Sequence, residues 1–269
     1  MKKQPARAKP NGLQSVIKTF EIVEYLAHNT ETGITELGNE LGQSKSTIYR
    51  FLSTLKSLGY VRQNRKSGKY TLTYKLFEIS SKAIEHDDTI AAARPVLEKL
   101  ASETGESIHL AVLERNSAVY IDNIDSAYNL RMFSHVGRSV PAHCTALGKA
   151  LLAFKSNEYL EDVYAHGGLV AYTPNTIVDL AKLKKNLALI RKNGVAVDNE
   201  EFEVGLKCVA APIYDSKGNA VASFCVAAPS IRLPQTQIKR LKEKVLQASK
   251  QISQRLGSSR GMPRITPPV

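Results

Sequence analysis

The sequence predicts a two-domain protein, in which a winged helix-turn-helix domain precedes an α+β domain. Two observations support this division. Helical periodicity gives way near Ser107 to short apolar strands, and a helix-turn-helix pattern followed by a basic hairpin precedes that change. A length of 269 residues is sufficient for two hydrophobic cores. The predicted order is a disordered basic tail (1–12), the winged helix-turn-helix domain (13–74), a linker helix (75–94), the α+β domain (95–256) and a disordered tail rich in Gly, Ser and Pro (257–269).

The clearest element of the first domain is the stretch SKSTIYRFLSTLKSLGYV, from Ser44 to Val61. Ser44 is a good N-cap for a helix, because its hydroxyl can accept a hydrogen bond from a backbone amide. Gly42 ends a shorter helix that follows Thr35, so the helix-turn-helix motif is expected over about 33–52. Apolar residues at helical spacing predict one buried face, which comprises Ile48, Phe51, Leu52, Leu55 and Leu58.

The opposite face of this helix carries short hydroxyl side chains and cations. In a helix-turn-helix protein the second helix lies in the major groove of DNA, with its N-terminal residues against the base edges. Short hydroxyls let the backbone approach, and cations bind phosphates and guanine. The residues of this helix expected to contact DNA are Ser44, Lys45, Ser46, Thr47, Tyr49 and Arg50.

A basic β-hairpin follows, in the stretch YVRQNRKSGKYTLT. Tyr60 and Val61 are expected to pair with residues 70–72 across a polar tip that contains Gly68. The hairpin could be a surface feature whose charges only keep the domain in solution. Its position directly after the helix instead favours a wing that contacts phosphates. The cations of this wing are Arg62, Arg65, Lys66 and Lys69.

The net charge of +12 is unevenly divided along the chain. Residues 1–80 carry a net +7, residues 81–231 a net −3 and residues 232–269 a net +8. The basic first part coincides with the predicted DNA-contacting helix and favours a polyanionic partner. A solvated basic surface without such a partner is the alternative.

The second domain is expected to combine strands with helices at intervals, which predicts a mainly antiparallel sheet covered by helices. The strand candidates are SIHLAVL, AVYIDNI, NLRMFS, CVAAPIY and AVASFCVAA. The helix candidates are CTALGKALLAF, the stretch 179–193 ending at Gly194, and a last helix from about Pro234 to Leu256.

Patterns for catalysis and metal binding are weak. The stretch HCTALGKA lacks the glycine-rich first half of a phosphate-binding loop. His143 is expected to be structural, because neighbours in sequence rarely form a base–nucleophile pair like the one it would make with Cys144. Six histidines without i, i+4 pairing argue against zinc. The acidic run VDNEEFE, residues 197–203, is expected to be a solvated loop, and no cofactor or metal is predicted.

The sequence also predicts a cytoplasmic protein without a membrane partner. The three cysteines form no C-x-x-C pair, which favours reduced thiols. No run approaches the roughly 18 apolar residues that span a bilayer. The basic start is followed by an amphipathic stretch and not by the apolar segment of a signal peptide.

These motifs together resemble the IclR family of bacterial transcriptional regulators, from about Leu13 to Leu256. The resemblance implies a winged helix that binds operator DNA and a GAF-like domain that binds a small effector. A symmetric dimer presents two recognition helices to two half-sites, so the operator is expected to be palindromic. It further implies dimers, or tetramers built from dimers, and a regulator that represses a catabolic operon. The matching stretches are SKSTIYRFLSTLKSLGYV, KYTLTYKLFE, HCTALGKALLA, DNEEFEVGLKCVAAPI and APSIRL.

The resemblance also implies an effector pocket. Its helix start falls on Ala146 and Leu147, whose backbone amides would hold a carboxylate, in agreement with anion binding at helix N-termini. Its acidic residue falls on Asp198, so Glu200, Glu201 and Glu203 are expected at the surface. Cys208 is either a ligand contact or a small buried residue. The residues that the resemblance assigns to the pocket are Met132, Ala146, Leu147, Asp198, Leu206 and Cys208.

One departure from the family affects the expected ligand. Cys225 and Ala227 stand where many relatives have Ser-x-Ser, so two hydroxyl donors are missing. The effector is therefore expected to be less polar at that end or to bind through water. The stretches IHLAVL and IDSAYNLRMFSHVGR most resemble the branch that represses sugar-acid catabolism and senses 2-keto-3-deoxygluconate.

Two other function classes are weaker interpretations. An enzyme on a GAF-like domain would use Cys208 or Cys144 as its nucleophile, but the sequence offers no credible base or orienting residue. It would also leave the winged helix unexplained. A non-specific architectural DNA-binding protein needs no pocket, and it would leave the acidic middle section without a role.

Overall fold

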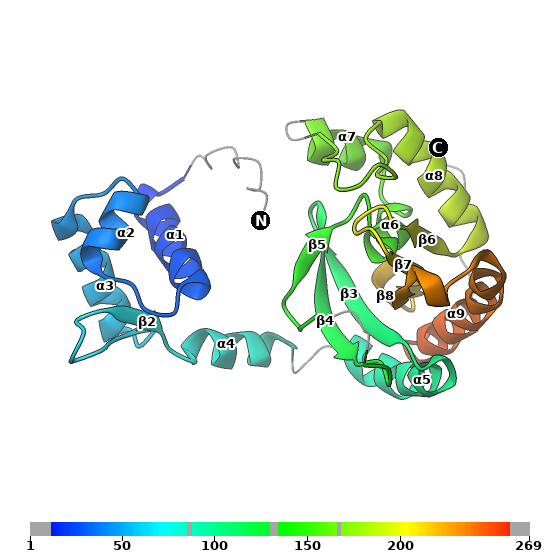
Figure 1. Ribbon diagram of the computed structural model, residues 1–269, viewed down its shortest axis with the longest axis horizontal. Coiled ribbons are helices and arrows are strands. Elements are labelled where there is room, and N and C mark those ends of the chain that lie inside the picture. The colour runs from blue at the N-terminus through cyan, green and yellow to red at the C-terminus, as the bar shows by residue number, and fades with distance from the viewer. Residues whose placement is uncertain (1–11, 85–87, 130–133, 166–167, 259–269) are drawn as a thin grey trace. The chain divides into compact units, whose positions relative to one another are not determined.

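The computed structural model describes residues 12–84, 88–129, 134–165 and 168–258 (Figure 1). The chain divides into two compact units, 1–87 and 88–269, each with its own hydrophobic core. Most of the expected strand NLRMFS, the expected pocket residue Met132, the tail at 1–11 and the tail at 259–269 lie outside the described residues.

The N-terminal unit contains the predicted helix-turn-helix and hairpin. Strands β1 and β2 pair antiparallel, with Val61 opposite Leu72. Ser44 caps α3 as predicted, since its Oγ accepts from the backbone N of Thr47 at 3.2 Å. Leu58 was expected on the buried face but is 59% exposed, because α3 ends before it. The elements are α1 (Gln14–His28), α2 (Ile34–Glu40), α3 (Lys45–Ser57), β1 (Val61–Gln63), β2 (Tyr70–Leu72) and α4 (Lys75–Ile84).

The linker differs from the prediction of one helix over 75–94. The structure has two helices there, α4 and α5 (Asp88–Thr104). Helix α5 belongs to the C-terminal unit, because Ala93, Val96 and Leu97 are buried in its core. Helical periodicity alone does not reveal which core an apolar face joins, and this explains the misplaced boundary.

The C-terminal unit is the predicted α+β domain. A six-stranded antiparallel sheet has the order β5-β4-β3-β8-β7-β6. The short elements β5, β6 and α7 were not predicted from the sequence. In chain order after α5, the elements are β3 (Ser107–Glu114), β4 (Ser117–Ile124), β5 (Ser139–Pro141), α6 (Ala146–Leu152), α7 (Asn157–Ala165), α8 (Leu180–Asn193), β6 (Ala196–Asn199), β7 (Leu206–Tyr214), β8 (Ala220–Pro229), the 3₁₀ turn η1 (Ser230–Arg232) and α9 (Gln235–Arg255).

Helices cover both faces of this sheet (Figure 1). Helices α5 and α9 pack on one face, and α6, α7 and α8 lie on the other. Because alternate side chains of a strand point to opposite faces, a sheet covered on both sides buries every position of its central strands. This accounts for the nearly continuous apolar sequences of β7 and β8.

The strand register places two rows of side chains on the sheet face under α6. Residues directly opposite each other in antiparallel strands project to the same face. The first, here called the Ser107 row, runs across four strands through Ser107, Ala227, Cys208 and Asp198. The second, called the His109 row, runs through His109, Cys225, Ala210 and Ala196.

Two glycines fix the helices on this side. A Cβ on Gly148 of α6 would lie 2.1 Å from the Cα of Ala142, so only glycine permits this close approach. Gly194 ends α8 as predicted, with φ +70° in the left-handed region.

Helix α9 ends at a structured cap. Ser258 was assigned to the disordered tail, but it is buried and its N donates to the carbonyl of Ser253 at 2.9 Å. Within the described part of the chain, no helix is both long and apolar enough to cross a bilayer.

Candidate DNA interface and effector site

Helix α3 presents its polar face to solvent. Lys45, Ser46, Tyr49 and Arg50 are exposed, as DNA contact requires. The hydroxyl of Ser44 is occupied locally. Its Oγ lies 2.9 Å from Ser46 Oγ, besides its contacts with the first turn of the helix. Ser44 therefore stabilises the helix start, and the exposed residues after it are the better candidates for base contacts.

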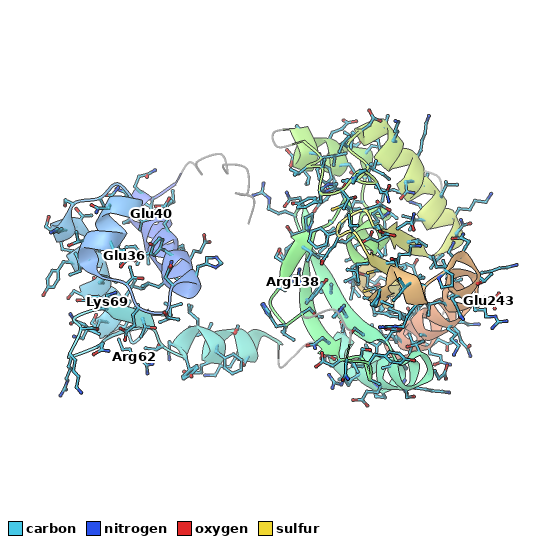
Figure 2. The ribbon with its side chains drawn as sticks, viewed as in Figure 1. Glu36, Glu40, Arg62, Lys69, Arg138 and Glu243 are labelled. Atoms are coloured by element: carbon cyan, nitrogen blue, oxygen red, sulfur yellow. The ribbon has the colours of Figure 1, made fainter. Side chains whose placement is uncertain are left out.

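The hairpin carries exposed cations at a fixed tip. Figure 2 shows Arg62 and Lys69 on this hairpin, and Arg65 and Lys66 are exposed beside them. Asn64 holds the tip in place. Its Oδ1 accepts from the backbone N of Lys66 at 2.9 Å, and its Nδ2 donates to Glu31 Oε1 at 2.8 Å. The wing is thus anchored to the loop after α1, which the sequence analysis did not identify.

A groove of about 410 Å³ runs between α1 and α3, and Arg50 and Thr47 form part of its lining. Lys18 of α1 lies in the same groove and donates to Gln43 Oε1 at 2.9 Å. The structure therefore adds Lys18 to the cations near the recognition helix. The signal in the sequence was only one lysine on the polar side of an amphipathic helix.

Substitutions in α3 and in the wing are expected to have different effects on DNA binding. Arg50→Ala or Lys45→Ala should weaken binding to the cognate site by about 1–3 kcal/mol wherever the side chain contacts a base. Arg65→Ala should weaken binding similarly on every sequence and reduce the salt slope by about one unit. Mobility shifts on operator and random DNA over a salt series measure both. Equal losses on both DNAs for the α3 variants would contradict base reading by this helix.

The C-terminal domain brings five of the six expected pocket residues to one side of the sheet. Asp198, Leu206 and Cys208 are buried on β6 and β7, and Ala146 and Leu147 begin α6, which packs on the same face. The carbonyl of Leu147 accepts from Ser223 Oγ of β8 at 3.0 Å, which ties the helix start to the sheet. Met132, the sixth residue, lies outside the described residues.

The first backbone amides of α6 lie at a helix start. Thr145 is the N-cap, and its Oγ1 accepts from the N of Gly148 at 3.3 Å. The first amides of a helix have no intrahelical acceptor. The amides of Ala146 and Leu147 can therefore donate to a ligand, although the helix itself has only seven residues.

Asp198 is buried, and the pKa of its carboxyl is raised. Burial raises the pKa of its carboxyl to about 7, against the lowering effects of a hydrogen bond from the backbone of Glu201 and the charge of Lys149. Its Oδ1 accepts from the backbone N of Glu201 at 2.7 Å. Asp198 therefore also holds the loop after β6.

Glu201 is not at the surface, and its expected exposure was wrong. The residue is 7% exposed and forms an ion pair with Lys149 of α6, with Nζ and Oε1 2.5 Å apart. Lys149 is completely buried and also donates to the carbonyl of Val197 at 2.7 Å. The acidic run is therefore not only a solvated loop, because a buried cation 52 positions earlier in the chain requires one of its carboxylates.

The polar residues Ser107 and His109 of β3 also lie on this face, and the sequence analysis gave them no role. Each is 1% exposed. The ring of His109 stacks on Tyr120 with centroids 4.9 Å apart. Burial lowers the pKa of His109 to about 4, so the imidazole is neutral at neutral pH. The available signal was polar residues at alternate positions in an apolar strand.

The buried thiols are poorly suited to nucleophilic catalysis. A hydrogen bond with Cys225, together with burial, raises the pKa of the Cys208 thiol. Burial and the nearby Asp198 raise that of Cys144. His143 contacts the carbonyl of Val170 through Nε2 at 3.0 Å, which occupies one of its ring nitrogens. Since the thiolate is the nucleophile, neither candidate cysteine is activated. Across the described residues, no cluster of His, Cys, Asp and Glu could hold a metal ion.

Two family models match the chain in the order of its two domains. The model described as IclR helix-turn-helix domain matches residues 15–65, and that described as Bacterial transcriptional regulator IclR C-terminal matches residues 81–254. The chain belongs to the IclR family. It is a DNA-binding transcriptional regulator with an effector-binding C-terminal domain, and it is not an enzyme.

Similar proteins support this assignment. The HTH-type transcriptional regulator KdgR of Dickeya chrysanthemi is 42% identical over 92% of this chain and 81% of its own length. KdgR of Escherichia coli K12 is 39% identical over 92% of this chain and 94% of its own length. The crystal structure of the Thermotoga maritima IclR has a TM-score of 0.72 at 31% identity, covering 91% of this chain and all of that one. IclR-family regulators bind operator DNA through the helix-turn-helix domain.

Proposed function

We propose that this regulator represses a catabolic operon from a palindromic operator, and that a small hydroxylated carboxylate such as a sugar acid alters its operator binding. We further propose that it acts in the cytoplasm as a homodimer or a dimer of dimers. The two KdgR relatives support the sugar-acid branch. The remaining support comes from the buried polar groups under α6.

The observation that carries the proposal is the position of Asp198 in the Ser107 row, beneath α6. An anionic ligand would place its carboxylate at the free amides of Ala146 and Leu147, where the helix dipole favours negative charge. Asp198 as an anion would repel that carboxylate. It can instead accept from a ligand hydroxyl or, when protonated, donate to the ligand. A ligand with both a carboxylate and hydroxyl groups satisfies both sites.

Exposed apolar side chains in the N-terminal unit support a homodimer. In and beside α4, Tyr74 is 84% and Phe77 70% exposed, and both lie beside a groove of about 590 Å³. On α1 and before it, Leu13 is 75% and Phe20 57% exposed. Large apolar side chains exposed beside a groove, as Tyr74 and Phe77 are, are typical of an interaction site. A second copy of the chain would cover it in a symmetric pair.

The proposed mechanism is a shift between dimer geometries. A symmetric dimer presents two recognition helices to two half-sites, so affinity for a palindrome depends on their spacing. An effector that binds one geometry more tightly shifts the population toward it. The loop after β6 is suited to respond, because Asp198 holds that loop while belonging to the ligand site.

Asp198→Asn is expected to separate two classes of ligand. Binding of 2-keto-3-deoxygluconate should weaken by about 1–3 kcal/mol, because an amide replaces the acceptor for its hydroxyls. Binding of pyruvate, a keto acid without hydroxyls, should be unchanged or tighter. The Asn Oδ1 can still accept from the amide of Glu201, so the loop should remain folded. Isothermal titration of both acids into the parent and the variant measures the difference.

Operator affinity is the control for this variant. Without ligand, Asp198→Asn should bind operator DNA as tightly as the parent does. Cys208→Ser should change the affinity for either acid only mildly if the thiol only packs. If Asp198→Asn binds each acid as tightly as the parent does, Asp198 is not part of the ligand site. A parent protein that binds neither acid and keeps its operator affinity in their presence would refute the sugar-acid proposal itself.

A further inference from the structure

Two buried polar atoms on β3 have no hydrogen-bond partner within the described part of the chain. They are Ser107 Oγ and His109 Nε2. Buried polar atoms are nearly always paired in native proteins, since leaving one unpaired loses its hydrogen bonds to water. Two such atoms at alternate positions of one strand share a face of the sheet. A ligand or a water molecule beside them would supply the missing hydrogen bonds.

The face they share is the proposed effector face. Ser107 is directly opposite Ala227, and His109 is opposite Cys225. Across the next strands the Ser107 row ends at Asp198 on β6. The other members of the two rows are small residues, which are Ala227, Cys208, Cys225, Ala210 and Ala196. Three strand spacings of about 4.8 Å separate the backbones of β3 and β6. Small residues on β8 and β7 therefore lie between two polar walls, which are Ser107 and His109 on β3 and Asp198 on β6.

The unpaired nitrogen of His109 has a fixed position. The ring stacks on Tyr120 at an interplanar angle of 7°, and Nδ1 lies 3.0 Å from Ser134 Oγ. Nε2 is therefore the nitrogen left for another group. A neutral imidazole offers one donor and one acceptor, and a serine hydroxyl offers both.

Ser107 and His109 are both uncharged, and this determines which chemical group of a ligand they can bind. Neither Ser107 nor neutral His109 carries a charge that could compensate a buried carboxylate, whose desolvation is expensive. A ligand hydroxyl both donates and accepts, so it can pair with either atom whichever tautomer His109 adopts. The chemistry of the wall thus favours hydroxyl groups over a carboxylate.

We propose that Ser107 Oγ and His109 Nε2 bind hydroxyl groups of the effector and form its second polar wall, opposite Asp198. This inference rests on the proposed effector function and names the ligand class further. The hydroxylated chain of a sugar acid would lie across the small residues, with its hydroxyls directed to β3. Ser107 and His109 would thereby distinguish hydroxylated acids from plain keto acids.

Histidine offers a matched pair of substitutions for the test. The amide of His109→Asn lies near the position of Nδ1 and can keep the contact with Ser134, while nothing replaces Nε2. The longer side chain of His109→Gln places its amide near Nε2 and gives up the contact with Ser134. Both remove the ring that stacks on Tyr120, so this loss is common to the two. Ser107→Ala removes only the unpaired hydroxyl, and without ligand it should melt at the same or a higher temperature than the parent.

The experiment is isothermal titration. The full-length parent and each of these variants are titrated with 2-keto-3-deoxygluconate and, separately, with pyruvate. Ser107→Ala and His109→Asn should each weaken 2-keto-3-deoxygluconate by about threefold to tenfold, the effect of one hydrogen bond. His109→Gln should retain more of that affinity than His109→Asn. Pyruvate should bind all variants within about twofold of the parent, since it has no hydroxyl to lose.

The failures of the two proposals are distinguishable. If the parent binds 2-keto-3-deoxygluconate and both Ser107→Ala and His109→Asn bind it equally well, the β3 atoms hold only water and this inference is overturned. Equal losses for 2-keto-3-deoxygluconate and pyruvate would also overturn it, because they would show a general distortion of the site. If the parent binds neither acid, the proposed effector class fails, and the hydroxyl wall fails with it.

Discussion

Lys149→Met is expected to lower the free energy of unfolding of the C-terminal domain by about 3–5 kcal/mol, the cost of removing one member of a buried ion pair. The lysine ammonium is completely buried, and its acceptors are the Glu201 carboxylate and the carbonyl of Val197. Methionine fills a similar volume but leaves the Glu201 charge buried without a cation. Urea denaturation followed by circular dichroism, analysed for the C-terminal transition, measures the loss.

Two further variants show that the loss comes from the unpaired charge. The double variant Lys149→Met with Glu201→Gln removes both charges and should recover most of the stability, since replacing a buried pair with neutral groups is often nearly neutral. Lys244→Met breaks an exposed pair with Glu103, whose side chains are 44% and 40% exposed. It should cost less than about 1 kcal/mol. A single Lys149→Met variant as stable as Lys244→Met would show that the buried pair does not support the fold.

The N-terminal domain was predictable because its signals are local. The N-cap at Ser44, the apolar spacing of α3 and the polar hairpin tip each depend on residues within a few positions of one another, and the structure has all three. Leu58 was misassigned because it continues the apolar spacing just beyond the end of the helix. The linker was misplaced for a different reason. Its apolar face packs in the second core, and such a choice depends on contacts distant in sequence.

The effector site was only partly predictable from the sequence. The resemblance assigned Asp198 and the α6 start to one pocket, and the structure has both on the same side of the sheet, but the resemblance did not reveal the hydrogen bonds and ion pairs on that side. Glu201 looked like one more acidic residue in a loop, and its buried partner Lys149 lies on another element. The roles of Ser107 and His109 follow from the register of β3 against β8, which no local pattern contains.

His109 is expected to make the stability of the C-terminal domain fall as the pH drops below about 6.5. Its pKa is about 4 in the folded protein, against a usual value of 6.5, because burial disfavours the imidazolium and the Arg138 charge adds to this effect. Between these two values the unfolded chain binds the proton and the folded one does not, so acid favours unfolding. The loss should reach about 2 kcal/mol at pH 5 and about 3 kcal/mol at pH 4, with nothing lost above the unfolded value.

Asp198 has the opposite effect, and because its pKa shift is the larger of the two it offsets the contribution of His109. Its folded pKa of about 7 lies above the usual 3.8, so the folded state binds the extra proton and gains stability as the pH falls through this window. The parent should therefore show a shallow net dependence on pH. His109→Asn removes the acid-sensitive group and leaves the contribution of Asp198, so its stability should rise relative to that of the parent as the pH falls from 7 to 4. The exposed His135 provides the matched control, and His135→Asn should follow the parent curve. Urea denaturation of the three proteins at half-unit pH intervals measures these differences. If the parent and His109→Asn curves run parallel from pH 7 to pH 4, the buried neutral histidine makes no contribution to acid sensitivity.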